Sequence, residues 1–485
     1  MKYNDLDIVG INSITFISKE KQPSLPMQLC IYFAQLFYYT FIRRFKYKAL
    51  PDKYKGIVFL GVSLNNQRSL DPIVKHLAED EYLYLKDHTT DIHKRRAYWL
   101  SLPYLPDLIR TYRKADAPTK AVIKRYFTRM WSTYGYYQLA KEYLEHYKVK
   151  VLALSSDQGE FHRCLLMRAQ EMGIKTIYVQ HASVAKGFPK LIASYSFLDG
   201  QESLDKYLEA GKPEGKVYLS GGVRFDPIFQ QYPTKHTEEV KTIGIAINML
   251  DDFEKVKSLC DFLVGQGYKL ALRPHPRYGS LDTAWLAKNA IAYSDPKAES
   301  SFDFISNIDL MISNESSIHL DAAMMQCPTV LYNFSTHPIL DHYAYIKSGL
   351  VKVADSEAQL IELIHNPKSL LPTLETLQFY NASCGTQLEG HLGEAIAAFI
   401  HTIVASNPYQ EGSQDLADTK WRTDLVNLFQ MNHLQPFANQ VIDRGGDLQF
   451  VECPKTQNKE NNRLQHCIDA QSENGVGKKT CKPRC

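Results

Sequence analysis

Short runs of β-branched and aromatic residues alternate with segments of helical periodicity along most of this chain, and that alternation constrains the fold more than any other feature. Alternation of this kind is typical of β-α units that build a parallel sheet. The segment 148–180 predicts strand, helix and strand in turn, with Gly173 ending the helix. In the first half of the chain the pattern predicts strands at 56–63, 81–86, 148–155, 174–180, 193–198 and 216–219.

A second series of alternating segments follows a polar stretch at 232–242, which we interpret as an interdomain linker. It predicts helices at 253–266, 301–307 and 317–325. It also predicts strands at 243–247, 268–273, 291–293, 310–313 and 329–332. We therefore expect the α/β class, with two Rossmann-like, doubly wound domains and an interdomain cleft, and 485 residues are enough for both.

The same patterns suggest how the chain is divided. Residues 1–54 precede the first predicted strand, and 406–485 form a polar tail in which hydrophobic periodicity fades, apart from a predicted helix at 421–437. Between them we expect a first domain at 55–235, carrying a mostly helical, aromatic and basic insertion at 95–147, and a second domain at 241–405.

Composition excludes several classes of protein. Lys and Arg number 56 against 53 Asp and Glu, so the net charge of +3 gives no reason to expect nucleic acid as a partner. The nine cysteines are widely spaced, which fits neither a disulfide framework nor a CxxC zinc site. Together with the lack of an apolar signal segment in the first twenty residues, this predicts a cytoplasmic protein.

The segment 25–42 is uncharged, rich in Phe and Tyr, and followed by Arg43, Arg44, Lys46 and Lys48. It is short for a spanning helix and contains Pro26, so one interpretation is an interfacial helix on the cytoplasmic face of the inner membrane. The other interpretation is a helix buried against the first domain. The sequence leaves both open.

Ligands of open α/β sheets bind beyond the carboxyl ends of the strands, so the loops that follow strands are the first candidates for a site. Arg273, His275 and Pro276 follow a predicted strand, in the sequence Arg-Pro-His-Pro. The prolines stiffen the loop, and the two cationic side chains suit a phosphate leaving group. A rigid surface turn with a solvated histidine is the alternative.

The second candidate loop contains Asn314, Glu315, Ser316 and Ser317, between a predicted strand and a predicted helix. The hydroxyls and free backbone N–H groups at a helix start favour an anion, although a simple serine cap has the same sequence. Since this loop and the Arg-Pro-His-Pro loop belong to the same domain, we expect both to face one cleft and to bind the donor.

Two further candidate loops belong to the first domain. Asp157 and Glu160 lie after one predicted strand and His181 lies after the next. A carboxylate or imidazole at a strand end is suited to take a proton from an acceptor hydroxyl, and we expect Asp157 to do so, ahead of Glu160 and His181. The alternative for Asp157 is that it caps the helix that begins near Glu160.

These residues resemble a known family. RPHP at 273–276 and SNESSIHLDAAMMQCPTVLY at 313–332 are similar to the donor-binding lobe of CDP-glycerol glycerophosphotransferases, bacterial polysialyltransferases and capsule polymerases, which are GT-B enzymes with CDP- or CMP-linked donors. The resemblance covers about 149–334. It implies that His275-Pro276 and Ser316-Ser317 hold the donor phosphate.

The same resemblance bears on the catalytic base. The acidic-acidic-Gly motif that supplies the base in this family resembles Asp157-Gln158-Gly159, where Gln158 replaces one acid. The segment VQHAS also resembles a Gln-His-Gly segment of capsule and lipopolysaccharide transferases, with Ala182 in the glycine position.

The sequence therefore predicts a metal-independent GT-B glycosyltransferase, or a glycerophosphotransferase-like enzyme. We expect it to transfer a unit from a nucleotide-activated sugar or glycerol donor, CMP- or CDP-linked, to a polysaccharide or glycolipid acceptor such as capsule, lipopolysaccharide or a teichoic-acid-like polymer. No cofactor is expected, because no GxGxxG motif follows a first strand, and the one Asp-x-Asp triplet, Asp5-Leu6-Asp7, lies outside any predicted sheet. The alternatives are a nucleotide-sugar 2-epimerase on the same scaffold and a non-catalytic polysaccharide-assembly protein.

Overall fold

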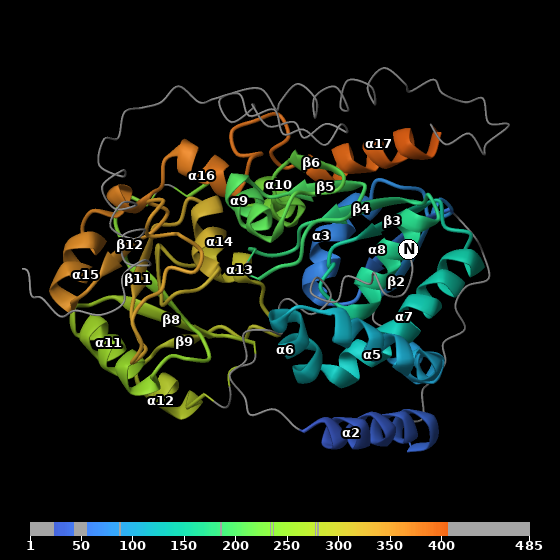
Figure 1. The fold of residues 1–485 in the computed structure, drawn as a ribbon. Helices are drawn as coiled ribbons and strands as arrows, with labels where there is room; N and C mark the ends of the chain where they lie inside the picture. The colour runs from blue at the N-terminus through green and yellow to red at the C-terminus, as the bar shows by residue number, and fades with distance from the viewer. Residues whose placement is uncertain are drawn as a thin grey trace, which may run out of the picture.

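The protein folds into two α/β domains, each built around a six-stranded parallel sheet (Figure 1). A computed structural model describes residues 24–42, 56–86, 89–184, 187–232, 234–235, 237–276, 278 and 281–405. The predicted fold class, two Rossmann-like domains, is confirmed by the two sheets. The predicted helix at 421–437 and the triplet Asp5-Leu6-Asp7 lie outside the described residues.

The first sheet has the strand order β2-β1-β3-β4-β5-β6, and all its neighbours are parallel. Its strands are β1 (Ile57–Gly61), β2 (Tyr82–Lys86), β3 (Val151–Leu154), β4 (Lys175–Val179), β5 (Tyr195–Leu198) and β6 (Lys216–Leu219). Because side chains alternate along a strand, Ile57 and Phe59 enter one hydrophobic core while Val58 and Leu60 enter another on the opposite face. Both faces of the sheet are therefore covered.

The face that contains Val58 packs against a helical layer that includes the long insertion. The helices of this domain are α3 (Leu64–Val74), α4 (Thr89–Ser101), η4 (Leu102–Tyr104), α5 (Leu105–Lys114), α6 (Ala117–Arg125), α7 (Phe127–His146), α8 (Glu160–Glu171), α9 (Gln201–Ala210), η5 (Val223–Phe225) and α10 (Asp226–Gln231). Helices α4 and α7 approach so closely that a Cβ atom on Gly135 would lie 1.7 Å from the carbonyl oxygen of Ala97. Glycine is therefore required at this contact.

The second sheet has the order β12-β11-β10-β7-β8-β9, again parallel throughout. Its strands are β7 (Thr242–Ile247), β8 (Lys269–Pro274), β9 (Ala292–Tyr293), β10 (Leu310–Ser313), β11 (Thr329–Tyr332) and β12 (Lys352–Ala354). Its helices are α11 (Phe253–Gly265), α12 (Thr283–Lys288), α13 (Ser301–Ser306), α14 (Ile318–Met324), α15 (Glu357–Ile364), η6 (Pro367–Leu370) and α16 (Leu374–Tyr380). The sequence patterns did not indicate β12, α12, α15 or α16.

The last described helix, α17 (Leu392–Ala405), crosses back to the first domain. It packs on α3 and β3, and in Figure 1 it lies with the elements of the first domain. Asp226 anchors the start of this helix, since its carboxylate accepts hydrogen bonds from the backbone N–H groups of Leu392 and Gly393 at 3.2 and 2.7 Å. The predicted range 241–405 thus includes a segment that packs on the other domain.

The segment before the crossing also contacts the first domain. The Asn381 side chain accepts a hydrogen bond from the N–H of Gly222 at 2.8 Å, and the N–H of Ala382 donates to the carbonyl of Asp199 at 2.7 Å. Gly222 and Asp199 lie in the loops that follow β6 and β5. The crossing segment therefore supports the strand-end loops of the first domain.

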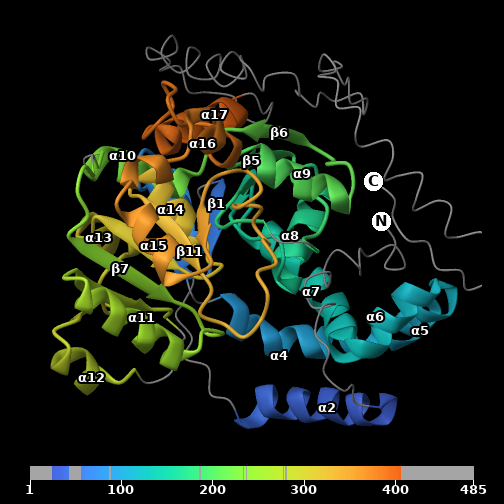
Figure 2. The same ribbon diagram turned by 90° about the vertical axis from the view of Figure 1, so that its left-hand side faces the viewer.

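Helix α2 (Leu25–Phe37) continues into a π-helical turn at Tyr38–Ile42. Figures 1 and 2 both show it at the edge of the molecule, beyond the α4–α7 layer. Of the described residues, Leu25–Ile42 is the one helical stretch that is long and apolar enough to cross a membrane by length and composition.

Candidate active site between the two domains

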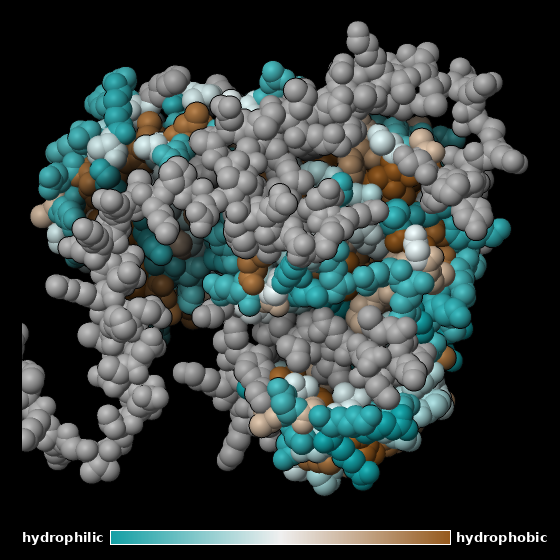
Figure 3. All heavy atoms as spheres, turned by 45° about the horizontal axis from the view of Figure 1, so that its top comes forward, coloured by the Kyte–Doolittle hydropathy of each residue, from teal (hydrophilic) through white to brown (hydrophobic). Residues whose placement is uncertain are grey.

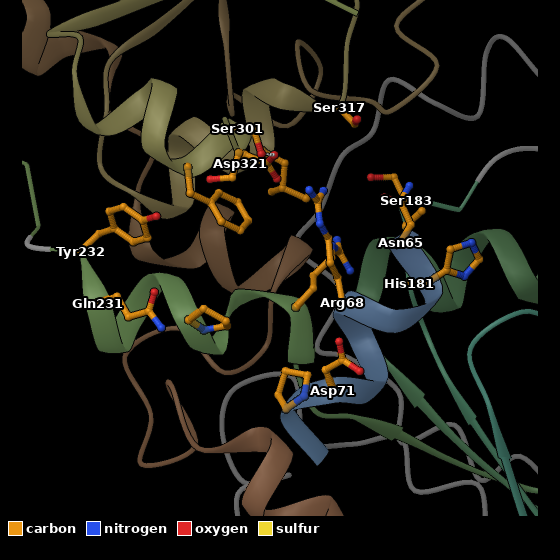
Figure 4. A pocket seen from close by; sticks show the side chains of 17 residues that line it. Asn65, Arg68, Asp71, His181, Ser183, Gln231, Tyr232, Ser301, Ser317 and Asp321 are labelled. Carbon is orange, nitrogen blue, oxygen red and sulfur yellow. Dashed lines mark hydrogen bonds between the residues drawn. The ribbon is translucent and has the colours of Figure 1, made fainter. Parts of the chain in front are cut away.

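A pocket of about 470 Å³ lies between the two domains (Figure 4). The first domain contributes α3 and the loops after β4 and β6, so this side of the pocket is formed at the carboxyl ends of its strands. The second domain contributes the beginnings of α13 and α14. The lining residues are Asn65, Arg68, Asp71, Pro72, His181, Ala182, Ser183, Arg224, Pro227, Gln231, Tyr232, Ser300, Ser301, Phe302, Ser317, Leu320 and Asp321.

Two arginines of the first domain line this pocket, and they are held differently. Arg224 follows β6 and forms an ion pair of 2.6 Å with the buried carboxylate of Asp199, while its guanidinium lies 4.3 Å from the ring centroid of Phe225. Arg68 is exposed on α3, and its side chain makes no hydrogen bond or ion pair with any residue that the structure describes. One cation is therefore fixed in place and the other is available to a ligand.

Asp321 lies on the opposite side of the pocket, on α14. Its carboxylate accepts a hydrogen bond from the hydroxyl of Ser301 at 3.0 Å. Burial raises the pKa of Asp321, while the positive charges of Arg224 and Arg68 act in the opposite direction. The pocket thus places hydroxyls and one carboxyl group of the second domain across from two cations of the first.

His181 follows β4 and lines the same pocket. Burial lowers its pKa to about 4, and the nearby positive charge of Arg224 adds to this effect. The imidazole is therefore neutral at pH 7. Its Nδ1 atom has no hydrogen-bond partner among the described residues.

Asp157 and Glu160, the other two candidate bases, do not line this pocket. The carboxylate of Asp157 lies 3.3 Å from the guanidinium of Arg163, and the two side chains are 2% and 0% exposed. The carboxylate of Glu160 is paired with Arg129. Both candidates thus have an arginine partner inside the first domain.

The Arg-Pro-His-Pro loop lies at the end of β8. Arg273 points into the second domain, where its guanidinium donates to the hydroxyl of Ser294 at 2.7 Å and to the carbonyl of Glu299 at 2.9 Å. His275 and Pro276 are exposed, and the backbone N–H of His275 donates to the carbonyl of Ile247 at 2.8 Å. None of the three predicted residues lines the interdomain pocket.

The loop after β10 is divided between structural contacts and the pocket. The Asn314 side chain donates to Asp251 at 2.7 Å, and the Glu315 carboxylate accepts from the backbone N–H groups of Leu340, at 3.1 Å, and His342. Ser317 lines the pocket.

Ser316 lies beside Ser317 but is absent from the pocket lining. Its hydroxyl accepts a long hydrogen bond, 3.5 Å, from the N–H of Ile318. The helix that begins here, α14, has only seven residues.

The structure therefore brings together His181 and Ser317 of the predicted site residues. Arg68, Arg224 and Asp321 were not predicted. Arg224 comes shortly after a strand and a Gly-Gly turn, so the rule of strand-end loops could have found it. Among the described residues there is no group of three or more His, Cys, Asp or Glu side chains that could hold a metal ion.

Comparison with solved structures finds proteins of the same two-domain arrangement. A UDP-N-acetylglucosamine 2-epimerase aligns with 75% of this chain and 100% of its own, at 12% identity and a TM-score of 0.46. MurG from Acinetobacter baumannii aligns with 71% of this chain and 99% of its own, at 12% identity and a TM-score of 0.42. The wall teichoic acid polymerase TagF aligns with 79% and 98%, at 10% identity and a TM-score of 0.42.

These likenesses concern the fold alone, and GT-B glycosyltransferases are among the structures that the chain resembles. No family model matches the chain, and no curated protein matches it.

Proposed function

We propose that this protein is a glycosyltransferase, or a glycerophosphotransferase-like enzyme, that uses a nucleotide-activated donor in the interdomain pocket. The observation that carries the proposal is the pair Arg68 and Arg224, which face hydroxyl and carboxyl groups of the second domain across a pocket at the strand ends. Transfer releases a nucleotide whose phosphate gains negative charge as its bond to the transferred sugar or glycerol phosphate breaks. Arginines placed at that phosphate stabilise the transition state more than the ground state.

The two arginines have distinct roles in this proposal. Arg224 is held by Asp199 and Phe225, so it loses little side-chain entropy on binding and supplies a preorganised charge. Arg68 has no partner within the described part of the chain and gains one when a phosphate arrives. Ser301 and Ser317 offer hydroxyls to the transferred unit or to the phosphate.

Asp157, Glu160 and His181 were predicted to act on the acceptor, and of these three His181 lines the pocket. Its imidazole is neutral at pH 7, because burial lowers its pKa to about 4, and its buried Nδ1 atom can take a proton only from an acceptor hydroxyl that reaches it as the ligand binds. Asp321 is a second group in the pocket with the same capacity, and burial makes its carboxyl group more basic than usual.

The donor is proposed to be CMP- or CDP-linked and the acceptor to be a growing surface polysaccharide or a glycolipid, as the family resemblance implies. The reaction would take place in the cytoplasm. His275 and Ser316 remain proposed donor contacts. They lie at the ends of β8 and β10 and would join the site if the domains close further on the donor.

The first test is to incubate the purified protein with CMP-, CDP-, UDP- and GDP-linked donors and to measure nucleotide release, with and without added polysaccharide. A transferase releases nucleotide in proportion to acceptor. Conversion of the donor without any acceptor would indicate the 2-epimerase alternative. Absence of turnover with every donor, together with retained polysaccharide binding, would indicate an assembly protein.

Variants connect the activity to the pocket. Replacing Arg68 by Ala removes one phosphate contact, and we expect donor KM to rise about tenfold or more, which corresponds to about 1.5–3 kcal/mol for a charged hydrogen bond. Arg95→Ala, which changes an exposed arginine of α4 outside the pocket, is the matched control. Equal KM values for the two variants would contradict the assignment of the donor to this pocket.

His275→Ala tests the remaining part of the proposed donor site. The side chain is exposed, so its loss should leave the fold intact. An enzyme that uses His275 on the donor phosphate would lose turnover, whereas full turnover in this variant would restrict the donor site to the arginine pair.

A further inference from the structure

Helix α2 has two opposite faces, and one of them is covered by the first domain. The inner face contains Gln28, Tyr32 and Leu36, which are buried against the helical layer of the first domain. Tyr32 is stacked on Trp131, with ring centroids 3.8 Å apart, and its hydroxyl donates to the carbonyl of Tyr98 at 2.7 Å. The helix is thus attached to the first domain by one side.

The outer face is a continuous apolar stripe. Met27, Cys30, Ala34, Phe37 and Phe41 recur at spacings of three and four residues, which places them along one side of a helix, opposite Tyr32. All five are exposed, and the exposed fractions of Met27, Phe37 and Phe41 are 55%, 56% and 70%.

Neighbouring side chains widen this stripe. Leu25, Phe33, Tyr38 and Ile42 are also at least 43% exposed. On the described part of the face shown in Figure 3, by contrast, hydrophobic side chains form separate patches among hydrophilic ones. An apolar surface of this extent on a folded domain indicates an interaction site.

The chemistry around the stripe favours a lipid surface as its occupant. Residues 25–42 contain no charged side chain, and the ammonium group of Lys94 lies 5.8 Å from the ring of Tyr39, near the C-terminal end of the helix. Trp99, 47% exposed, donates its indole N–H to the hydroxyl of Thr40 at 3.0 Å. An apolar stripe with aromatic and basic borders is typical of helices that lie in the headgroup region of anionic membranes.

We propose that the outer face of α2 inserts into the surface of an anionic membrane, with the helix axis in the membrane plane. The helix does not span the bilayer in this arrangement, because Gln28 and Tyr32 keep their hydrogen bonds to Lys124 and Tyr98 of the first domain. The inner face then corresponds to the helix buried against the first domain, and the outer face to the interfacial helix, which are the two interpretations that the sequence left open. The membrane would hold the first domain and leave the second domain free.

The test uses the full chain and vesicles, without any donor, so its outcome is independent of the proposed reaction. The wild-type protein is centrifuged with vesicles of phosphatidylcholine alone and with vesicles that also contain phosphatidylglycerol. We expect it to sediment with the mixed vesicles. Phe37→Ser combined with Phe41→Ser should lower the partition coefficient about a hundredfold, at about tenfold for each phenyl group withdrawn from the membrane.

The matched control replaces two exposed apolar residues elsewhere, Met172→Ser with Val264→Ser, and should bind like the wild type. Circular dichroism and thermal unfolding establish that both double variants are folded. The proposal is overturned if the wild-type protein fails to bind the mixed vesicles, or if the Phe37/Phe41 variant binds them as well as the control does. It is also overturned if light scattering shows a wild-type dimer that these substitutions dissociate while vesicle binding is unchanged.

Discussion

Replacing Asp157 by Asn distinguishes a catalytic carboxylate from a structural one. Asp157 is 2% exposed and its partner Arg163 is 0% exposed, at 3.3 Å. The neutral amide of the variant would remove the negative charge that lies 3.3 Å from the buried Arg163 guanidinium, and loss of one partner of a buried pair costs about 3–5 kcal/mol. Since Arg163 keeps a hydrogen bond of 2.8 Å to the carbonyl of Lys190, we expect the lower end, about 3 kcal/mol.

Calorimetry measures this change directly. For a domain of this size a loss of about 3 kcal/mol lowers the midpoint of thermal unfolding by about 6–12 °C. Adding Arg163→Met to Asp157→Asn removes both charges, and most of the lost stability should return, because neither charge is then buried alone.

The structural interpretation of Asp157 also has a clear refutation. If Asp157→Asn unfolds within about 1 °C of the wild type but abolishes nucleotide release, the carboxylate is not needed for stability and acts on the acceptor instead. The reasoning from its burial and its arginine partner would then be wrong, and the assignment made from the sequence alone would stand.

Three further predictions concern packing, pH and the crossing segment. Gly135→Ala forces a Cβ into the carbonyl of Ala97 and should lower the free energy of unfolding by about 3 kcal/mol in urea titrations, whereas Gly265→Ala, with no atom within 4 Å of the added Cβ, should raise it by about 0.5 kcal/mol. Burial raises the pKa of Asp199 from 3.8 to about 6, so the folded state holds this proton more tightly than the unfolded state. The free energy of unfolding of the wild type, relative to Asp199→Asn, should therefore fall by about 2.4 kcal/mol between pH 4 and pH 7, and a flat difference would contradict this. Asn381→Ala leaves the buried N–H of Gly222 without its partner and should cost about 1–3 kcal/mol by the same titration, while an unchanged midpoint would show that water replaces the amide.

The sequence predicted the fold well where strands are buried on both faces. Runs such as 151–154 and 310–312 are continuously apolar, and each lies next to the centre of its sheet. Strand β12 was missed because it is an edge strand of three residues, of which Lys352 is exposed, so no periodicity marks it.

The site was harder to predict than the fold. His181 and Ser317 were found because both follow strands, but the same rule also selected Asp157, and nothing in its spacing to Arg163 shows that the two side chains meet inside the domain. The same rule selected Arg273, but its guanidinium donates hydrogen bonds to Ser294 and Glu299 inside the second domain and does not line the pocket. Asp321 depends on how the domains face each other, and no local pattern of one chain segment encodes that orientation.

The return of the chain to the first domain through α17 also limits how the two domains can move relative to each other. The domains are joined twice, once by the segment between α10 and β7 and once by the segment between α16 and α17. Two rigid domains that are joined by two chain segments can rotate about the line between those segments, while sliding and twisting of one domain against the other are resisted. Opening and closing of the interdomain pocket would then follow this one rotation.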